Sequence, residues 1–215
     1  MNKEEKKITY KFSLLGDSKV GKTTIFKKIL TGKFSFKNLS TVGIETRVLS
    51  YEDLEISING QIVKKSFDIK LFDTAGQEKF RAITKNYIND SDGIILIYDI
   101  TNRESFINIK GWLDNIIDIL SDWRKSSSYF ILLLGNKLDL AKGDINLRKV
   151  DIEEGEKLSK DFNIFWGGEC SAKDFTEQQF KDLLGDFIKK IYPNIKKEDN
   201  KSQKIKKDKK KKKFC

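Results

Sequence analysis

The chain has 215 residues, enough for one domain of ordinary size and an appendage. It contains two cysteines and no histidine, which excludes a disulfide framework, histidine-based catalytic triads and most zinc sites. The net charge is +10, but residues 196–215 carry +8 of it, with eleven lysines against three acidic residues. The rest of the chain is close to neutral, unlike a domain that binds nucleic acid through a basic face.

The apolar runs are short. The strongest, at 93–100 and 129–135, fall well below the roughly 18 apolar residues that a membrane span needs. The first ten residues, MNKEEKKITY, lack the apolar stretch of a secretory signal. The cysteine usage suits a reducing cytosol.

Short apolar runs alternate with longer amphipathic stretches, which is typical of βαβ units around a mostly parallel sheet. The predicted strands lie near 10–15, 44–50, 67–72, 94–99, 130–134 and 163–165, and the predicted helices near 22–31, 104–121, 152–162 and 177–191. Asn59-Gly60 is a two-residue hairpin signal, so the second and third strands should be antiparallel.

The apolar positions of this hairpin change phase. Leu54, Ile56, Ile58 and Ile62 share a parity that Phe67 breaks, which predicts a bulge or an irregular stretch between them. Pro193 is the only proline and should follow the last helix. We therefore expect an N-terminal extension over 1–9, a folded domain over 10–192 and a tail over 193–215.

A phosphate-binding pattern follows the first predicted strand. Residues 16–23 read GDSKVGKT, which is G-x-x-x-x-G-K-S/T between a strand and a helix. Backbone N–H groups of such a loop form an anion nest, and Gly21 keeps a Cβ away from the phosphates at the helix N-terminus. Lys22 can reach the β and γ oxygens, and the Thr23 hydroxyl can ligate Mg²⁺. The alternative is a chance glycine turn, and the pattern alone leaves the base and the reaction open.

Four further polar motifs support a nucleotide site. They are TVG at 41–43, DTAGQ at 73–77, NKLD at 136–139 and CSAK at 170–173. The first lies in a polar loop after the first helix, and the others follow predicted strands. Ligands gather beyond the carboxyl ends of the strands in an open α/β sheet, so these motifs should meet at one edge.

With these motifs in this order, residues 10–192 resemble the Ras superfamily of small GTPases and, within it, the Rab family. The resemblance rests on GDSKVGKT, DTAGQEKFRAIT, LIYDIT followed by ESF, GNKLDL and ECSAK. It implies the P-loop small GTPase fold, an α/β fold with a six-stranded, mostly parallel sheet, one antiparallel hairpin and helices on both faces.

The resemblance also implies a set of site residues. Asp139 would accept hydrogen bonds from the guanine edge, Asn136 would support that loop, and Lys137 and Phe34 would sandwich the ring. Thr23 and Thr41 would ligate Mg²⁺, with Asp73 reaching the ion through water. The other nucleotide-binding residues that it implies are Gly16, Ser18, Lys19, Val20, Gly21, Lys22, Thr24, Gly76, Ser171, Ala172 and Lys173.

The implied activity is a switch driven by slow GTP hydrolysis. Gln77 would orient the attacking water. GTP hydrolysis would then proceed at about 10⁻⁴ s⁻¹ unaided and up to about 10⁵-fold faster with an arginine from an activating protein. Loss of the γ-phosphate would release the loops held by the backbones of Thr41 and Gly76. By resemblance we expect a monomer that regulates vesicle and membrane trafficking through effectors, an exchange factor and an activating protein. The nearly neutral body predicts no nucleic-acid partner.

Three features depart from the Rab pattern. An aromatic cluster that reads partners in Rab proteins corresponds here to Thr46, Phe72 and Tyr87, and two of these three differ from the usual Phe, Trp and Tyr. The segment from Thr41 to Asp73 is longer than is common, which extends the hairpin, and the simplest interpretation of this extension is a solvated surface loop. The chain ends in one cysteine where Rab proteins usually carry two.

The tail, KIKKDKKKKKFC at 204–215, has three interpretations: a solvated segment, a nuclear-targeting signal or a membrane anchor. The resemblance favours prenylation at Cys215. A single lipid chain attaches only marginally, and lysines beside an anionic cytoplasmic leaflet add about 1 kcal/mol each. We expect the protein on the cytoplasmic face of an intracellular membrane, with a cytosolic pool. The lipid type stays open, because neither a double cysteine nor a C-a-a-X box is present.

Two other functions compete with this interpretation of the whole chain. A nucleic-acid binder would use the lysine tail, but the nearly neutral body argues against it. A scaffold that no longer switches would usually lack the equivalents of Lys22, Asp73 or Gln77, and this chain keeps all three.

Overall fold

The computed structural model describes residues 7–34, 45–73, 81–120 and 130–193. Six strands form one sheet in the order β2-β3-β1-β4-β5-β6. The strands are β1 Ile8–Leu15, β2 Glu45–Ile58, β3 Gln61–Asp73, β4 Gly93–Asp99, β5 Ile131–Asn136 and β6 Phe165–Glu169. The helices are α1 Lys22–Thr31, α2 Arg81–Asp90, α3 Arg103–Leu120, α4 Leu138–Gly143, the 3₁₀ turn η2 Ile145–Leu147, α5 Ile152–Asp161 and a C-terminal helix over 177–193.

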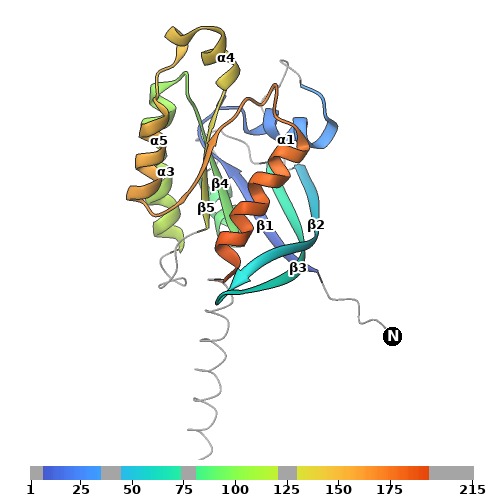
Figure 1. Ribbon diagram of the computed structural model, residues 1–215. Helices are drawn as coiled ribbons and strands as arrows, with labels where there is room; N and C mark the ends of the chain where they lie inside the picture. The colour runs from blue at the N-terminus through green and yellow to red at the C-terminus, as the bar shows by residue number, and fades with distance from the viewer. Residues whose placement is uncertain (1–6, 35–44, 74–80, 121–129, 194–215) are drawn as a thin grey trace, which may run out of the picture.

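The sheet has the predicted mixed topology. Strands β2 and β3 pair antiparallel, and every other neighbouring pair is parallel. All residues of β4 and β5 are buried, as expected for central strands covered on both faces. The parallel strands end at the same edge, where α4 lies in the upper part of Figure 1. This edge is therefore the place where the polar motifs should meet.

Helices cover both faces of the sheet (Figure 1). On one face, α1 and the C-terminal helix bury side chains such as Phe26 and Phe187 in a first core cluster with Phe12 and Leu14 of β1. On the other face, α2, α3 and α5 contribute to a second cluster. The alternation of side chains along the strands explains the division, because successive residues point to opposite faces.

The β2–β3 hairpin is part of the folded body and not only a solvated loop. Its pairing continues to Ile58↔Gln61 at the Asn59-Gly60 turn. Ile56 is 1% exposed within the first core cluster, and the Tyr51 hydroxyl donates to the Lys181 carbonyl of the C-terminal helix at 2.9 Å. The hairpin runs toward the lower end of the sheet in Figure 1.

The predicted irregularity of the hairpin exists, but it lies on β2. The register shifts between Tyr51 and Leu54, where Asp53 has a φ of 47° and its N–H donates to the Ser66 hydroxyl at 3.2 Å. Because β2 has one extra residue at this point, the positions of β2 that face the core change from odd-numbered to even-numbered residues. Ile62, which the sequence pattern grouped with Ile56 and Ile58, does not face the core, since it is 71% exposed.

Several predicted boundaries were wrong. The last strand starts at Phe165 and not at Asn163, whose φ of 51° is left-handed and does not suit a strand. The C-terminal helix continues through Pro193, the last residue of the described range, where the sequence suggested that the helix had already ended. Helices α2 and α4 were not predicted at all.

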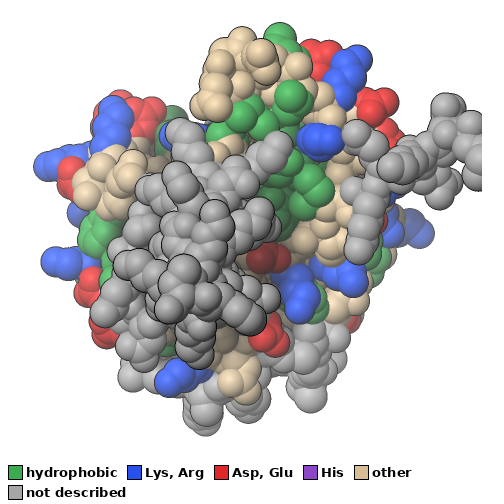
Figure 2. Space-filling model, turned by 90° about the horizontal axis from the view of Figure 1, so that it is seen from below, with side chains coloured by type: hydrophobic (Ala, Val, Ile, Leu, Met, Phe, Trp, Pro, Cys, Tyr) green, Lys and Arg blue, Asp and Glu red, His purple; other side chains and the backbone are tan. Residues whose placement is uncertain are grey.

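None of the helices in the described part of the chain is both long and apolar enough to cross a membrane. On the face shown in Figure 2, acidic and basic side chains are interspersed and do not form one basic surface.

Candidate functional site

The loop between β1 and α1 has the backbone that the phosphate-binding pattern requires. Gly16, Lys19 and Gly21 have φ values of 133°, 68° and 104°. A Cβ on Gly16 would lie 2.1 Å from the Ile97 carbonyl oxygen, and one on Gly21 would lie 2.2 Å from the amide nitrogen of Asn136. Both positions therefore exclude any side chain, and the loop packs directly on β4 and β5.

The side chain of Lys22 lies across this loop and is held by the loop's own carbonyl oxygens. It is 4% exposed, and its ammonium donates to the carbonyl oxygens of Gly16 at 2.8 Å and Asp17 at 2.6 Å. No side chain caps the N-terminus of α1 at Gly21, and the first N–H groups of any helix are donors that have no acceptor within the helix. A cation and a helix N-terminus at one loop favour an anion such as a phosphate.

Asp73 is a buried carboxylate at the carboxyl end of β3. It lies opposite Leu14 in the β1–β3 register and is 0% exposed. Neither of its carboxylate oxygens has a hydrogen-bond partner among the residues that the structure describes. Burial raises the pKa of Asp73; the Thr23 hydroxyl, which is close but does not meet hydrogen-bond geometry, and the Lys22 charge partly offset this rise.

This arrangement fits a divalent cation. A buried carboxylate without a partner is costly, and an ion bound by oxygen ligands would satisfy it. Carboxylate, hydroxyl, water and phosphate oxygens are the ligands that Mg²⁺ prefers. Asp73 and Thr23 are thus a matching donor set, whereas Thr41 lies outside the described residues.

Asn136 joins three of the predicted motifs at the end of β5. It is 1% exposed. Its amide nitrogen donates to the Val20 carbonyl at 2.8 Å, and its amide oxygen accepts from the backbone N–H of Ala172 at 3.0 Å. The Leu138 N–H also donates to the Cys170 carbonyl at 3.0 Å. The phosphate loop, the NKLD loop and the CSAK loop therefore form one connected site.

Lys137 has an unusual backbone and a specific partner. Its φ is 72°, and its ammonium pairs with Asp99 at 2.6 Å, where the Asp99 side chain is 7% exposed. Asp99 also accepts from the N–H and hydroxyl of Thr101 at 2.8 and 2.6 Å. The end of β4 thus fixes the Lys137 stem, which lies beside the loop that would receive the base.

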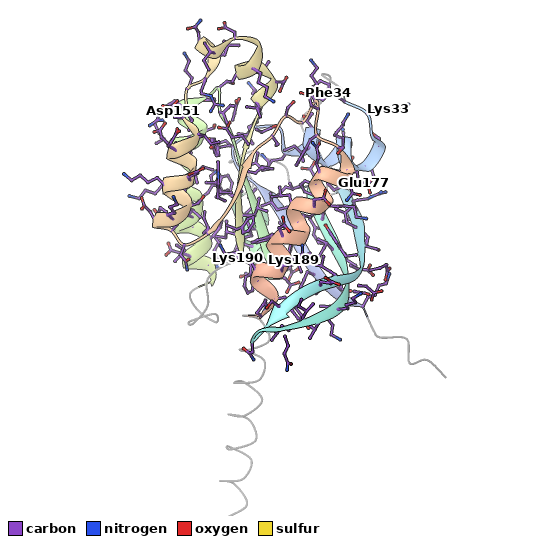
Figure 3. The ribbon with its side chains drawn as sticks, in the orientation of Figure 1. Lys33, Phe34, Asp151, Glu177, Lys189 and Lys190 are labelled. Carbon is purple, nitrogen blue, oxygen red and sulfur yellow. The ribbon has the colours of Figure 1, made fainter. Side chains whose placement is uncertain are left out.

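The remaining residues of the predicted base pocket lie at the same edge. Asp139 is partly buried in the first turn of α4. Ser171 is 7% exposed, and its hydroxyl accepts from the N–H of Lys173 at 3.2 Å. Phe34 packs against the first core cluster and lies above Glu177 in the view of Figure 3. Ser18 and Lys19 are exposed on the loop, and Thr23 and Thr24 are partly buried.

Other predicted site residues lie outside the described residues: Thr41, Gly76, Gln77 and Cys215. Conversely, two site contacts were not anticipated. Asp99 pairs with Lys137, and the Asp17 carboxylate accepts from two side chains of α3. The only sequence signal for Asp99 was its place at the end of an apolar strand, within LIYDIT.

Comparison with known proteins agrees with this geometry. Residues 11–193 match the Ras family. The chain is 38% identical over 184 residues to the Ras-related protein Rab-8B of Pongo abelii, which covers 85% of this chain and 80% of that protein. It is 36% identical over 179 residues to the Ras-related protein RIC1 of Oryza sativa subsp. japonica, covering 82% of this chain and 79% of that protein.

The matched region contains the phosphate loop, the Asn136 contacts and the Asp73 carboxylate. Ras-family GTPases generally depend on Mg²⁺, bind guanine nucleotides and act through regulators and effectors. The chain therefore belongs to the Ras family and, within it, to the Rab-related GTPases, which bind GTP, hydrolyse it and act as molecular switches in vesicle trafficking.

Proposed function

We propose that the connected loops at the carboxyl edge of the sheet bind GTP and GDP with each loop in a separate role. The observation that carries the proposal is the buried Asn136 amide, which holds the phosphate loop and the CSAK loop against the NKLD loop. Phosphates would lie on the N–H groups of residues 16–24, with Lys22 leaving its two loop carbonyls for the β and γ oxygens.

Guanine selection falls to Asp139. A carboxylate accepts hydrogen bonds only, so it pairs with the amide and amine edge of guanine and is left unsatisfied against adenine. The Lys137 stem, fixed by Asp99, and Phe34 would cover the two faces of the ring. Ser171, Ala172 and Lys173 would complete the pocket on the side that Asn136 supports.

Mg²⁺ would be held by Thr23 and Thr41 directly and by Asp73 through water. The ion supplies positive charge against the β- and γ-phosphates. The buried carboxylate of Asp73, which accepts no hydrogen bond from the described residues, supports this assignment. Gln77 would orient the water that attacks the γ-phosphate, and the backbones of Thr41 and Gly76 would hold the loops that hydrolysis releases.

The output of this switch would be a change of surface. Exchange factor, activating protein and effectors would contact the two loops around Thr41 and Gln77, and Thr46 and Phe72 would read partners different from the usual ones. The tail would anchor the protein to the anionic cytoplasmic face of an intracellular membrane through Cys215 and the lysines, with a cytosolic pool. The body would act as a monomer.

Nucleotide selectivity tests the proposed site. We expect the purified protein to carry guanine nucleotide and to bind GTP far more tightly than ATP. Asp139→Ala should reduce GTP affinity by at least about a hundredfold, because a buried or charged hydrogen-bond partner left unmatched commonly gives discrimination of this size. Asp144→Ala, an exposed acidic residue five positions away, is the matched control and should bind like the wild type. Equal affinities for GTP and ATP in the wild type would contradict the proposal.

A further inference from the structure

The carboxylate of Asp17 lies inside the phosphate loop and yet is bound from outside it. Its Oδ1 accepts from the Trp112 indole N–H at 2.8 Å, and its Oδ2 accepts from the Asn108 amide at 2.8 Å. Each carboxylate oxygen thus has its own donor on α3. The two donors are four residues apart, so they project from the same face of the helix.

The donors sit on a firmly packed helix. Ile109, Leu113 and Ile116 of α3 are each 0% exposed in the second core cluster, and the Trp112 ring packs against that cluster. The Trp112 bond is partly buried and the Asn108 bond is exposed. Because water competes with exposed hydrogen bonds, Trp112 should contribute more to holding Asp17 than Asn108 does.

The backbone of the same residue contacts the main cation of the loop. The Asp17 carbonyl accepts from the Lys22 ammonium at 2.6 Å, so one residue connects α3 with Lys22. A free carboxylate in a loop that binds phosphate would repel the ligand. Two N–H donors outside the loop disperse its charge and fix the direction of its side chain.

We propose that Asp17 is a positioning residue whose carboxylate, held by Trp112 and Asn108, fixes the phosphate loop for the nucleotide. This inference rests on the proposed function of residues 16–24. It assigns to α3 a role in nucleotide retention that acts through Asp17, since α3 contributes none of the residues that would touch the nucleotide.

The test measures the dissociation rate of fluorescently labelled GDP from the full chain, together with urea unfolding. Trp112→Phe keeps the ring and removes the donor, and it should speed dissociation up to about tenfold, since a hydrogen bond to a charged group supports a change of that order. Asp17→Ala should do the same, and Asp17→Asn, which keeps an acceptor oxygen, should release GDP more slowly than Asp17→Ala. The matched controls are Trp166→Phe on β6, which also removes an indole next to the second core cluster, and Asn115→Ala, whose amide donates to Gly111 within α3; both should release GDP at the wild-type rate.

A double variant separates positioning from packing. If Trp112 acts through Asp17, Trp112→Phe should add no further acceleration in the Asp17→Ala background. Acceleration that persists there would overturn the proposal, because the ring would then act through packing alone. Wild-type dissociation in both single variants would also overturn it. Lys22→Ala tests the proposed phosphate loop separately from the role of Asp17. If this variant leaves GDP binding unchanged, the proposed phosphate loop itself is wrong.

Discussion

Asn136 shows how one buried side chain can organise a nucleotide site. Its amide offers a donor and an acceptor on opposite sides, and it uses both on backbone groups of different loops, at Val20 and Ala172. The sequence marked Asn136 as a support for the NKLD loop only through family resemblance. Its contact with the phosphate loop could not be predicted from sequence, because it depends on the parallel pairing of β4 and β5 and on the close approach of Gly21.

Asn136→Ala should therefore weaken the fold as well as the site. The substitution leaves the Val20 carbonyl and the Ala172 N–H without their partner, so the free energy of unfolding should fall by about 2–4 kcal/mol. Urea unfolding measures the loss. The matched control is Asn146→Ala, an exposed residue whose side chain bonds only to nearby Asp144 among the described contacts; it should change stability by less than about 0.5 kcal/mol. A loss no larger than in this control would contradict the supporting role.

In the proposed mechanism, turnover would depend on Gln77, a different residue from those that would bind the nucleotide. Gln77→Leu should retain GTP affinity and slow hydrolysis by at least about tenfold, since orienting the water stabilises the transition state and not the bound substrate. Single-turnover phosphate release measures the rate. Gln61→Leu, at the exposed turn of the hairpin, is the control and should hydrolyse GTP like the wild type. An unchanged rate in Gln77→Leu would remove this residue from the reaction.

Sequence reasoning described the β2–β3 hairpin only in part. The turn at Asn59-Gly60 and the antiparallel pairing were predicted correctly, because that turn has a strong local signal. The docking of the hairpin on the C-terminal helix was not predicted, since it joins segments about 130 positions apart. Helix α4 was missed because its six residues are too few to show a periodicity. Helix α2 has ten residues, as many as the correctly predicted α1 and α5, so its length does not explain why it was missed.

Tyr51 tests the contribution of this docking. Its side chain is 8% exposed, and its hydroxyl donates to Lys181. Tyr51→Phe removes this hydrogen bond and keeps the ring, so the free energy of unfolding should fall by about 1 kcal/mol. The control is Tyr192→Phe, whose ring packs edge-on against Phe67 and whose hydroxyl has no hydrogen-bond partner within the described ranges. Equal stability of the two variants would mean that the hairpin is held by its apolar contacts alone.

At the scale of the whole molecule, charge separates the body from the tail. Residues 1–195 carry a net charge of +2 and residues 196–215 carry +8. The face shown in Figure 2 carries both acidic and basic side chains among its described residues. A lysine cluster of this kind attracts an anionic membrane within about a Debye length, roughly 8 Å at physiological ionic strength. The tail is thus the part of the chain that would determine membrane association.

Cys215→Ser tests the anchor. A single lipid chain gives marginal, reversible attachment, and the neighbouring lysines would supply the second attraction. In cells, the wild type should be found in the membrane fraction and Cys215→Ser in the soluble fraction. Replacing the five lysines at 209–213 by glutamine should keep the lipid and weaken membrane association. Membrane association of the wild type should also fall more steeply with added salt than that of this variant. Mass measurement of the intact protein identifies the lipid. Unchanged membrane association of Cys215→Ser, or an intact wild-type protein without lipid mass, would leave the tail as a solvated or nuclear-targeting segment.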